Sequence, residues 1–404
     1  MNSRKVVLNT LIKVEEGCYS NLLANSFFEY DETAFIYALF YGVIERKITL
    51  DYILNVFLNK SIDKQNLYIK NLLRMGAYEA VFMNTPIYAV VNEYVSLIKK
   101  SKFKGLSGLV NAILRKIPSF DINTLKKQDE EVRYSINNSV KNIIYKAIGK
   151  EEGENFLKNS LKTPPIFVRI NKLKNPCFKI PNNFIETSIN NTYEVKKFSS
   201  NDTAFINGEY YIQDISATES VLMANPQKNE KILDLCAAPG GKSFTAYLLS
   251  NGEADITSCD VSEKRLQLMQ ESANKLGFKI KINLNDASVY NESLGLYDLV
   301  ICDVPCSGFG VIRRKPEVKY KNESDISSIV NIQKNIVDNA VKYLKPDGRL
   351  LYSTCTLNVL ENEDMVKYIL EKNSDLTCIN MNTFLPKNNN GDGFFAALLK
   401  KVKN

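Results

Sequence analysis

The second half of the chain alternates apolar runs with amphipathic stretches, and this pattern limits the possible folds more than any other feature. The apolar runs are KILDLCA, ADITSCD, IKINLND, YDLVICD and GRLLYSTCT, and the intervening helices are expected near 242–251, 262–277, 325–344 and 358–373. Nearly continuous apolar strands separated by helices predict a mostly parallel sheet covered on both faces. Such sheets bind ligands at the carboxyl ends of their strands. Asp260, Asp286, Asp303 and Cys355 all follow predicted strands there.

The first part of the chain predicts a different architecture. Residues 1–120 repeat apolar side chains at i, i+3, i+4 and i+7, which indicates a bundle of helices with its own core. The stretch FVRIN at 167–171 alternates like a half-buried strand. We therefore expect a helical domain at 1–125, a connector with a small α+β subdomain at 126–210, and an α/β domain with a Rossmann-like sheet at 211–404.

Composition excludes several classes of chemistry. The chain of 404 residues contains no histidine, which excludes Ser-His-Asp triads and H-E-x-x-H sites. Its eight cysteines form no C-x-x-C pair, so we expect no metal site. No long apolar run suggests a signal peptide or a membrane span, so a cytoplasmic protein is expected. The net charge of +7 is compatible with an anionic partner.

A loop of small residues follows the first strand of the α/β domain and opens a helix. It matches neither the P-loop, which needs glycine where Cys236 stands, nor G-x-G-x-x-G. Small residues allow a ligand to approach the backbone, and the helix N-terminus offers free N–H groups. The small residues of the loop are Ala237, Ala238, Gly240 and Gly241.

Two of the strand-end carboxylates suit an adenosine ligand. Asp260 is placed to bind a ribose diol, and Asp286 could meet an adenine amino group. Either aspartate alone is more often a helix cap. Together with the loop they favour S-adenosylmethionine as the cofactor over a dinucleotide.

Two cysteines lie just beyond predicted strands, Cys306 in DVPCSG and Cys355 in YSTCTL. Most cysteines beside strands are buried and inert, as we expect for Cys259 and Cys302. A thiol near S-adenosylmethionine nevertheless suits methylation of cytosine C5. A thiolate that adds to C6 makes C5 nucleophilic. Asp303 could bond N3 of the ring, and Lys242 could orient the cytosine. The spacing leaves open which thiol attacks.

The motifs DLCAAPGGKS, DVPCSGFGVIRRKPEVK and YSTCTLNVLENEDMV resemble those of the Sun/Fmu-type RNA (cytosine-5)-methyltransferases. The resemblance covers about 160–404. It implies a Rossmann-like enzyme that uses S-adenosylmethionine, with Cys355 as nucleophile and Cys306 as the residue that assists adduct release. It also implies that Asp260, Asp286 and Asp303 bind the cofactor together with the loop residues Cys236, Ala237, Ala238, Pro239, Gly240, Gly241 and Lys242. Lys315 and Tyr320 depart from the family pattern, which often has His and Trp there.

The helical region resembles the RNA-binding antitermination factor NusB, through LRMGAYEAVFMNTPIYAVVNEYV and FKGLSGLVNAILRKI. The combination is similar to the bacterial enzyme that methylates cytosine 967 of 16S rRNA. It implies 16S rRNA or an assembling small ribosomal subunit as partner, and we expect a monomer. A tRNA (cytosine-5)-methyltransferase and a non-catalytic RNA-binding assembly factor are the alternatives. Expected RNA contacts are Arg313, Arg314, Lys315, Arg169 and Asn171.

Overall fold

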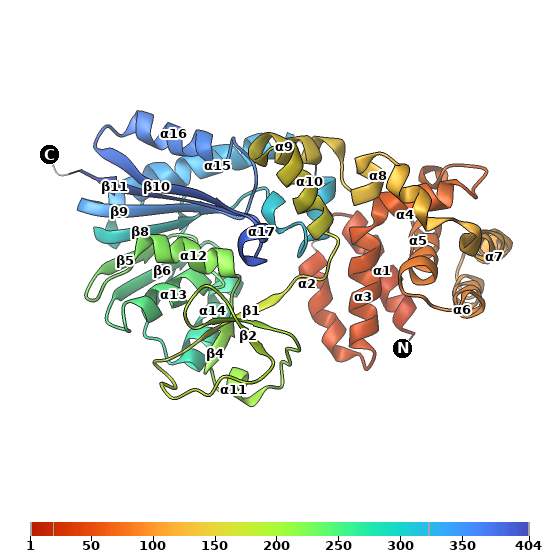
Figure 1. Cartoon of the computed structure of the whole chain (residues 1–404), viewed down its shortest axis with the longest axis horizontal. Helices are drawn as coiled ribbons and strands as arrows, with labels where there is room; N and C mark the ends of the chain where they lie inside the picture. Colours follow the sequence, from red (N-terminus) through yellow and green to blue (C-terminus); the bar gives the residue numbers. More distant parts are fainter. Residues whose placement is uncertain (1, 19, 322–323, 403–404) are drawn as a thin grey trace. The chain divides into compact units, whose positions relative to one another are not determined.

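The computed structural model describes residues 2–18, 20–321 and 324–402 and divides the chain into two compact units (Figure 1). The helical unit comprises the residues up to Lys141 together with Arg314–Lys321. The α/β unit comprises Asn142–Arg313 and the residues after Lys321. The helical unit therefore extends past residue 125 and includes a segment that lies far along the chain.

The helical unit is a bundle built from the amphipathic stretches at the start of the sequence. Its helices of nine residues or more are α1 (Ser3–Glu15), α3 (Thr33–Glu45), α4 (Lys47–Asn55), α5 (Leu67–Phe82), α6 (Ile87–Lys99) and α7 (Ser107–Lys116). Helix α5 packs against α1, α3, α4, α6 and α7, and its buried residues include Leu72, Leu73 and Met75. The expected helical domain is confirmed.

The segment Arg314–Lys321 joins this bundle as a strap, most of it the 3-10 helix η8 (Pro316–Tyr320). The Tyr320 hydroxyl donates to the carbonyl of Ile44 (2.7 Å) and lies 2.9 Å from Ser135 Oγ. Lys319 is fully buried and its ammonium group lies 3.5 Å from the carbonyl of Tyr134. The strap is therefore held by buried polar contacts as well as by packing.

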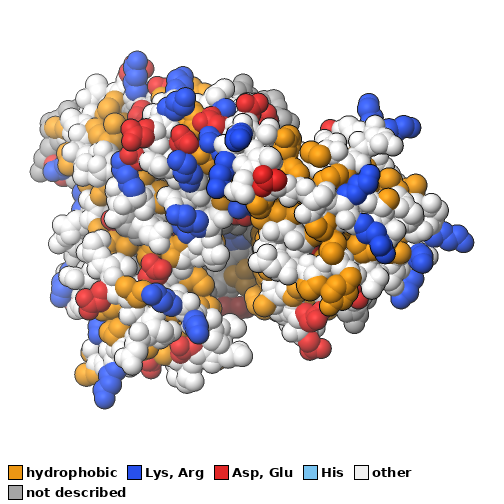
Figure 2. Space-filling view, turned by 45° about the vertical axis from the view of Figure 1, so that its right-hand side comes forward, with side chains coloured by type: hydrophobic (Ala, Val, Ile, Leu, Met, Phe, Trp, Pro, Cys, Tyr) orange, Lys and Arg blue, Asp and Glu red, His pale blue; other side chains and the backbone are white. Residues whose placement is uncertain are grey.

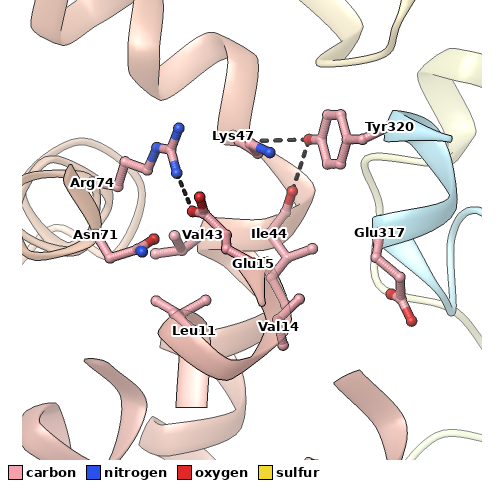
Figure 3. A pocket seen from close by; sticks show the side chains of 10 residues that line it. All are labelled: Leu11, Val14, Glu15, Val43, Ile44, Lys47, Asn71, Arg74, Glu317 and Tyr320. Atoms are coloured by element: carbon pink, nitrogen blue, oxygen red, sulfur yellow. Dashed lines mark hydrogen bonds and ion pairs between the residues drawn. The ribbon is translucent and has the colours of Figure 1, made fainter. Parts of the chain in front are cut away.

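A cavity of about 250 Å³ lies within the helical unit, between α1, α3, α4, α5 and the strap (Figure 3). Arg74 crosses its wall and pairs with Glu15 (2.5 Å) and Asp51 (2.6 Å). These carboxylates raise the pKa of Arg74 against the opposing effect of its burial. The Lys47 ammonium lies over the ring of Tyr320 at 5.1 Å. No cysteine lines this cavity, and the ion pairs of its wall connect helices of the bundle.

The α/β unit begins with helix α9 (Asn138–Ile148, its first residues in the helical unit) and helix α10 (Lys150–Asn159). A small antiparallel sheet follows, in the order β2-β3-β1-β4. Its strands are β1 (Ile166–Ile170), β2 (Phe184–Glu186), β3 (Thr192–Val195) and β4 (Tyr210–Ile212). Phe184, Val168 and Tyr210 form its core. The strand expected at FVRIN is β1.

Two residues that we expected to contact RNA are buried in this part of the fold. Asn171 is 0% exposed, and its amide donates to the carbonyls of Gly208 (3.0 Å) and Leu276 (2.9 Å). Arg169 is 4% exposed and donates to Thr192 Oγ1 (3.2 Å), and burial lowers its pKa. Both side chains hold the small sheet in place.

The larger sheet has seven strands in the order β10-β11-β9-β8-β5-β6-β7. Its strands are β5 (Lys231–Asp234), β6 (Asp255–Asp260), β7 (Lys281–Leu284), β8 (Tyr297–Asp303), β9 (Leu344–Thr354), β10 (Leu376–Phe384) and β11 (Phe394–Lys401). Strands β5 to β9 pair in parallel, whereas β11 pairs antiparallel with both β9 and β10. The predicted Rossmann-like class with a mostly parallel sheet is confirmed.

Helices cover both faces of this sheet (Figure 1). One core contains residues of α12 (Ile215–Ala224), α13 (Gly241–Leu249) and α14 (Glu263–Leu276). The core on the opposite face contains residues of α15 (Ser324–Ala340) and α16 (Glu363–Lys372). Within the described residues, no helix is both long and apolar enough to span a membrane.

Candidate active site

The loop between β5 and α13 is shaped by a glycine and by Asp260. Gly240 has a φ of +109°, and a Cβ there would come within 2.4 Å of the Phe244 ring. Asp260 is 3% exposed and accepts from the backbone N–H of Ala238 (3.2 Å) and from that of Ser262 (3.0 Å). Its carboxylate thus fixes the loop from the neighbouring strand. Pro239 follows a cis peptide bond.

An open cleft of about 630 Å³ lies at the carboxyl ends of β6 and β7. Val261, Leu284 and Val289 line it with apolar side chains that are more than half exposed. The rest of the lining carries polar groups, from Asn285, Asp286, Tyr290, Asn291 and Glu292. Apolar surface combined with placed polar groups is typical of a small-molecule site. Asp286 lies at the cleft, two residues beyond the end of β7, and accepts from the backbone N–H (2.9 Å) and hydroxyl (2.7 Å) of Ser288.

One residue that lines the cleft has a buried hydrogen-bond donor. Asn285 is 9% exposed, and its amide oxygen accepts from Asn291 (2.9 Å). Its Nδ2 has no hydrogen-bond partner among the described residues. A buried unpaired donor is costly unless a ligand satisfies it. The small-residue loop, the apolar lining and this donor fit an adenosine group, so the residues present suit S-adenosylmethionine.

An ion pair joins the start of α13 to the end of β8. Lys242 Nζ lies 2.7 Å from Asp303 Oδ2, and the lysine side chain is 9% exposed while that of the aspartate is 32% exposed. Ser353 donates to the other oxygen of Asp303 at 2.8 Å, and the Lys242 ammonium lies 4.7 Å from the centre of the Phe394 ring. Asp234 is fully buried beside them, and burial raises its pKa to about 7 despite a bond from Ser243.

The two cysteines that follow β8 and β9 meet. Cys306 Sγ lies 3.1 Å from Cys355 Sγ, and both residues are half-buried. The pKa of the Cys306 thiol is raised well above its usual value. The causes are the contact with Cys355, burial, and the nearby carboxylates of Glu361 and Asp303. Cys306 is therefore held as a neutral thiol beside the other sulfur.

Three other cysteines near this site differ from the pair. Cys259 and Cys302 are 0% exposed, as expected of inert core thiols, and burial raises the pKa of Cys259 to about 12. Cys236 lies in the cofactor loop, and burial also raises its pKa. Among the described residues no cluster of cysteines and carboxylates could hold a metal ion.

The basic residues after the Pro-Cys turn separate between the two units. Arg313 belongs to the α/β unit, where it donates to the carbonyls of Lys162 (3.0 Å) and Thr163 (2.5 Å). Arg314 and Lys315 belong to the strap of the helical unit. Figure 2 shows Lys and Arg side chains scattered over the visible face among Asp and Glu.

Several residues of this site escaped the sequence reasoning. Val261, Leu284 and Val289 read as ordinary apolar positions, although all three are exposed. Asn285 directly follows Leu284 at the end of β7 and precedes Asp286, so its position at a strand end was a usable signal. Gly310 lies against the second cysteine, and its N–H donates to the carbonyl of Cys355 at 3.1 Å.

Comparison with known proteins gives a consistent result along the chain. Residues 221–400 match the family described as 16S rRNA methyltransferase RsmB/F, and residues 1–119 match the NusB family. A probable ribosomal RNA small subunit methyltransferase B of Bacillus subtilis (strain 168) is 32% identical, over 92% of this chain and 89% of that protein. The ribosomal RNA small subunit methyltransferase B of Proteus mirabilis is 27% identical, over 92% and 90%.

Solved structures share the fold. The crystal structure of PH0851 superposes with a TM-score of 0.82 over 99% of each chain, at 20% identity. The structure of NSun6 from Pyrococcus horikoshii with SFG covers 66% of this chain and 99% of that one, with a TM-score of 0.56 and 21% identity.

Proposed function

The chain belongs to the RsmB/F family of S-adenosylmethionine-dependent rRNA methyltransferases, and on that premise we propose that it methylates C5 of a cytosine in 16S rRNA through a covalent adduct. The observation that carries the proposal is the pair of sulfurs 3.1 Å apart, at the same sheet edge as the Lys242–Asp303 ion pair. Methylation of an exocyclic amine or a ribose hydroxyl needs no thiol, whereas methylation of C5 does.

We assign the two thiols the roles that the family resemblance implies. Cys355 as thiolate adds to C6 of the cytosine, which moves electron density to C5. Bound S-adenosylmethionine supplies the methyl group that C5 accepts. Once Cys355 is bonded to C6, Cys306 gives its own proton to solvent and, as thiolate, takes the C5 proton, while Cys355 leaves C6 as thiolate and restores the ring. This order is the one that the family resemblance implies, and with 3.1 Å between the two sulfurs one thiol lies within reach of the adduct formed by the other.

Asp303 and Lys242 have positioning roles in this proposal. A carboxyl group at Asp303 can hydrogen-bond N3 of the ring and stabilise the adduct. The Lys242 ammonium, 2.7 Å away, holds that carboxyl group in place. Asp260, Asp286 and the loop from Cys236 to Lys242 are proposed to bind the cofactor. Asn285 and the exposed apolar residues of the cleft are added to that set.

The helical unit is proposed to contribute to RNA binding, as its NusB match suggests. Arg314 and Lys315 are retained as candidate phosphate contacts. Arg169 and Asn171 are not, because both are buried and serve the small sheet.

The test is methyl transfer from labelled S-adenosylmethionine to purified 16S rRNA, 23S rRNA and tRNA, followed by bisulfite sequencing. We expect a cytosine that resists bisulfite conversion in 16S rRNA and none in 23S rRNA or tRNA. Protection in tRNA would select the tRNA enzyme instead. Absence of transfer to all three, with RNA binding retained, would favour an assembly factor.

A further inference from the structure

A buried carboxylate lies beneath the two cysteine turns and takes no part in the chemistry described above. Glu361 is 0% exposed. It follows the second cysteine in the sequence TCTLNVLENE and precedes helix α16. No lysine or arginine of the described chain lies within ion-pair distance of it. A charge without a counter-ion at this depth is costly unless hydrogen bonds satisfy it.

Each oxygen of Glu361 accepts two hydrogen bonds. The Oε1 atom accepts from Ser307 Oγ (2.5 Å) and from Asn358 Nδ2 (2.8 Å). The Oε2 atom accepts from the backbone N–H of Ser307 (2.8 Å) and from Gln333 Nε2 (3.0 Å). These donors come from the turn that follows Cys306, from the turn that follows Cys355 and from helix α15. One carboxylate therefore joins both turns to the same helix.

Neighbouring contacts strengthen the same connection. Gln333 Nε2 also donates to the carbonyl of Pro305 at 2.9 Å, directly before Cys306. Ser307 Oγ lies 2.6 Å from Thr356 Oγ1, directly after Cys355. The hydroxyl of Tyr352 donates to the carbonyl of Glu361 at 2.5 Å. The residues on either side of Cys306 and the residue after Cys355 are thus fixed by one buried network.

We propose that Glu361 is a positioning residue whose buried carboxylate holds the two cysteine turns against each other and keeps a negative charge beside Cys306. The proposal rests on the proposed function, in which the two thiols act on one cytosine. Turns that are already ordered hold the two thiols close to the geometry that the reaction requires. The contact with Cys355 and burial raise the pKa of the Cys306 thiol, and the charge of Glu361 adds to this rise.

The closing experiment uses Glu361→Gln in the full chain. Glutamine has the same size as glutamate, but its amide N–H groups would face groups that donate hydrogen bonds to the carboxylate. Single-turnover methyl transfer is expected to slow by about 10- to 100-fold, the equivalent of one or two lost bonds to a charged group. Binding of S-adenosylmethionine is expected to stay unchanged. Glu371→Gln, an exposed glutamate paired with Lys367, is the matched control and should keep the full rate.

A second measurement needs neither RNA nor cofactor. In a Cys355→Ser background, the rate of alkylation of Cys306 by iodoacetamide is followed against pH by mass spectrometry of its peptide. Adding Glu361→Gln should move the midpoint to lower pH by about half a unit or more, because a neighbouring negative charge is gone. An unchanged midpoint together with an unchanged transfer rate would overturn the proposal. A wild-type enzyme that methylates no RNA would defeat the proposed function and leave this measurement intact.

If Glu361→Gln does not fold, as judged by circular dichroism, Asn358→Ala replaces it. This variant removes one of the four donors and keeps the carboxylate. We expect methyl transfer to slow, while the midpoint of the pH dependence of Cys306 alkylation does not move to lower pH. A full transfer rate in this variant would reject the positioning role.

Discussion

The sulfur of Cys306 lies 3.1 Å from that of Cys355, although 49 positions separate them in the sequence. The register of two strands produces this contact. Strands β8 and β9 run in parallel, with Asp303 opposite Ser353, so turns that leave their carboxyl ends come together. A reacting cytosine would meet both thiols at one place, and several variants can test what each thiol does.

Replacing Cys355 with alanine should abolish methyl transfer, by at least about 1,000-fold, because the covalent route loses its nucleophile. Affinity for S-adenosylmethionine should remain, since the cofactor cleft lies along β6 and β7 and does not include this residue. Transfer assays and calorimetry on the same preparation measure both quantities. Retention of full activity would show that the attacking thiol is another one.

Replacing Cys306 with alanine should leave attack possible and slow release of the product. Protein linked to RNA should then accumulate in the presence of S-adenosylmethionine. The linked species should run as a slow band on denaturing gels. The double variant Cys306→Ala with Cys355→Ala is the control and should give no band. Absence of the band in the single variant would count against a release role.

Asp260→Ala should weaken cofactor binding by about 10-fold or more, since its carboxylate fixes Ala238 in the loop and is proposed to meet the ribose. Asp255→Ala is the matched control. Asp255 begins the same strand and pairs with Lys281 at its exposed end. Calorimetry should show wild-type affinity for the control. Equal affinity in the Asp260 variant would rule out the ribose contact.

The stability of the helical unit should rise between pH 7 and about 10. Burial lowers the pKa of Lys319 from 10.5 to about 7, so the unfolded chain keeps a proton that the folded chain has released. Below pH 7 both states are protonated, and the full cost of the buried charge remains. Lys319→Met should therefore stabilise the unit at pH 7.5, by about 1–3 kcal/mol, and flatten this rise.

Thermal unfolding of the wild type and of Lys319→Met at pH 7.5 and 9.5 measures the effect. Lys315→Met, at an exposed position of the same strap, is the control and should behave like the wild type. Parallel pH dependence of wild type and Lys319→Met would refute the assignment to this lysine.

Gly310→Ala should inactivate the enzyme without disturbing the helical unit. A Cβ at this position would come within 1.9 Å of the carbonyl oxygen of Gly393, and the carbonyl of Cys355 is also close, at 2.9 Å. The backbone must then move beside Cys355, the proposed nucleophile. Gly108→Ala, which meets nothing within 4 Å, is the control for a tolerated glycine. Normal turnover by Gly310→Ala would show that this close approach is not required.

The candidate site residues at the strand ends were predictable because each lies next to its strand in the sequence. Apolar runs identify parallel strands, and parallel strands share one carboxyl edge. Asp303 and Cys355 were therefore expected near one another, and the structure places them after neighbouring strands. The cofactor loop was predictable for the same reason, since its glycines and the strand before it are contiguous.

Contacts that depend on tertiary packing were not predictable. Asn171 looks like any polar residue after a strand, and only the fold brings it to the carbonyl of Leu276. Glu361 resembles a surface residue before a helix, and its burial arises from donors on α15 and on two separate turns. Tyr320 reads as a residue of the catalytic motif, yet its hydroxyl bonds the helical bundle.

That last contact has a practical consequence for dissecting the protein. The strap returns to the bundle from a point far along the chain, so no single cut yields both parts complete. A fragment that ends at Lys141 lacks the tyrosine that bonds Ile44 and Ser135. A fragment that starts after Lys141 contains the strap but lacks the bundle against which Lys319 is buried. A design that divides the protein should therefore attach the strap to the first fragment or keep the chain whole.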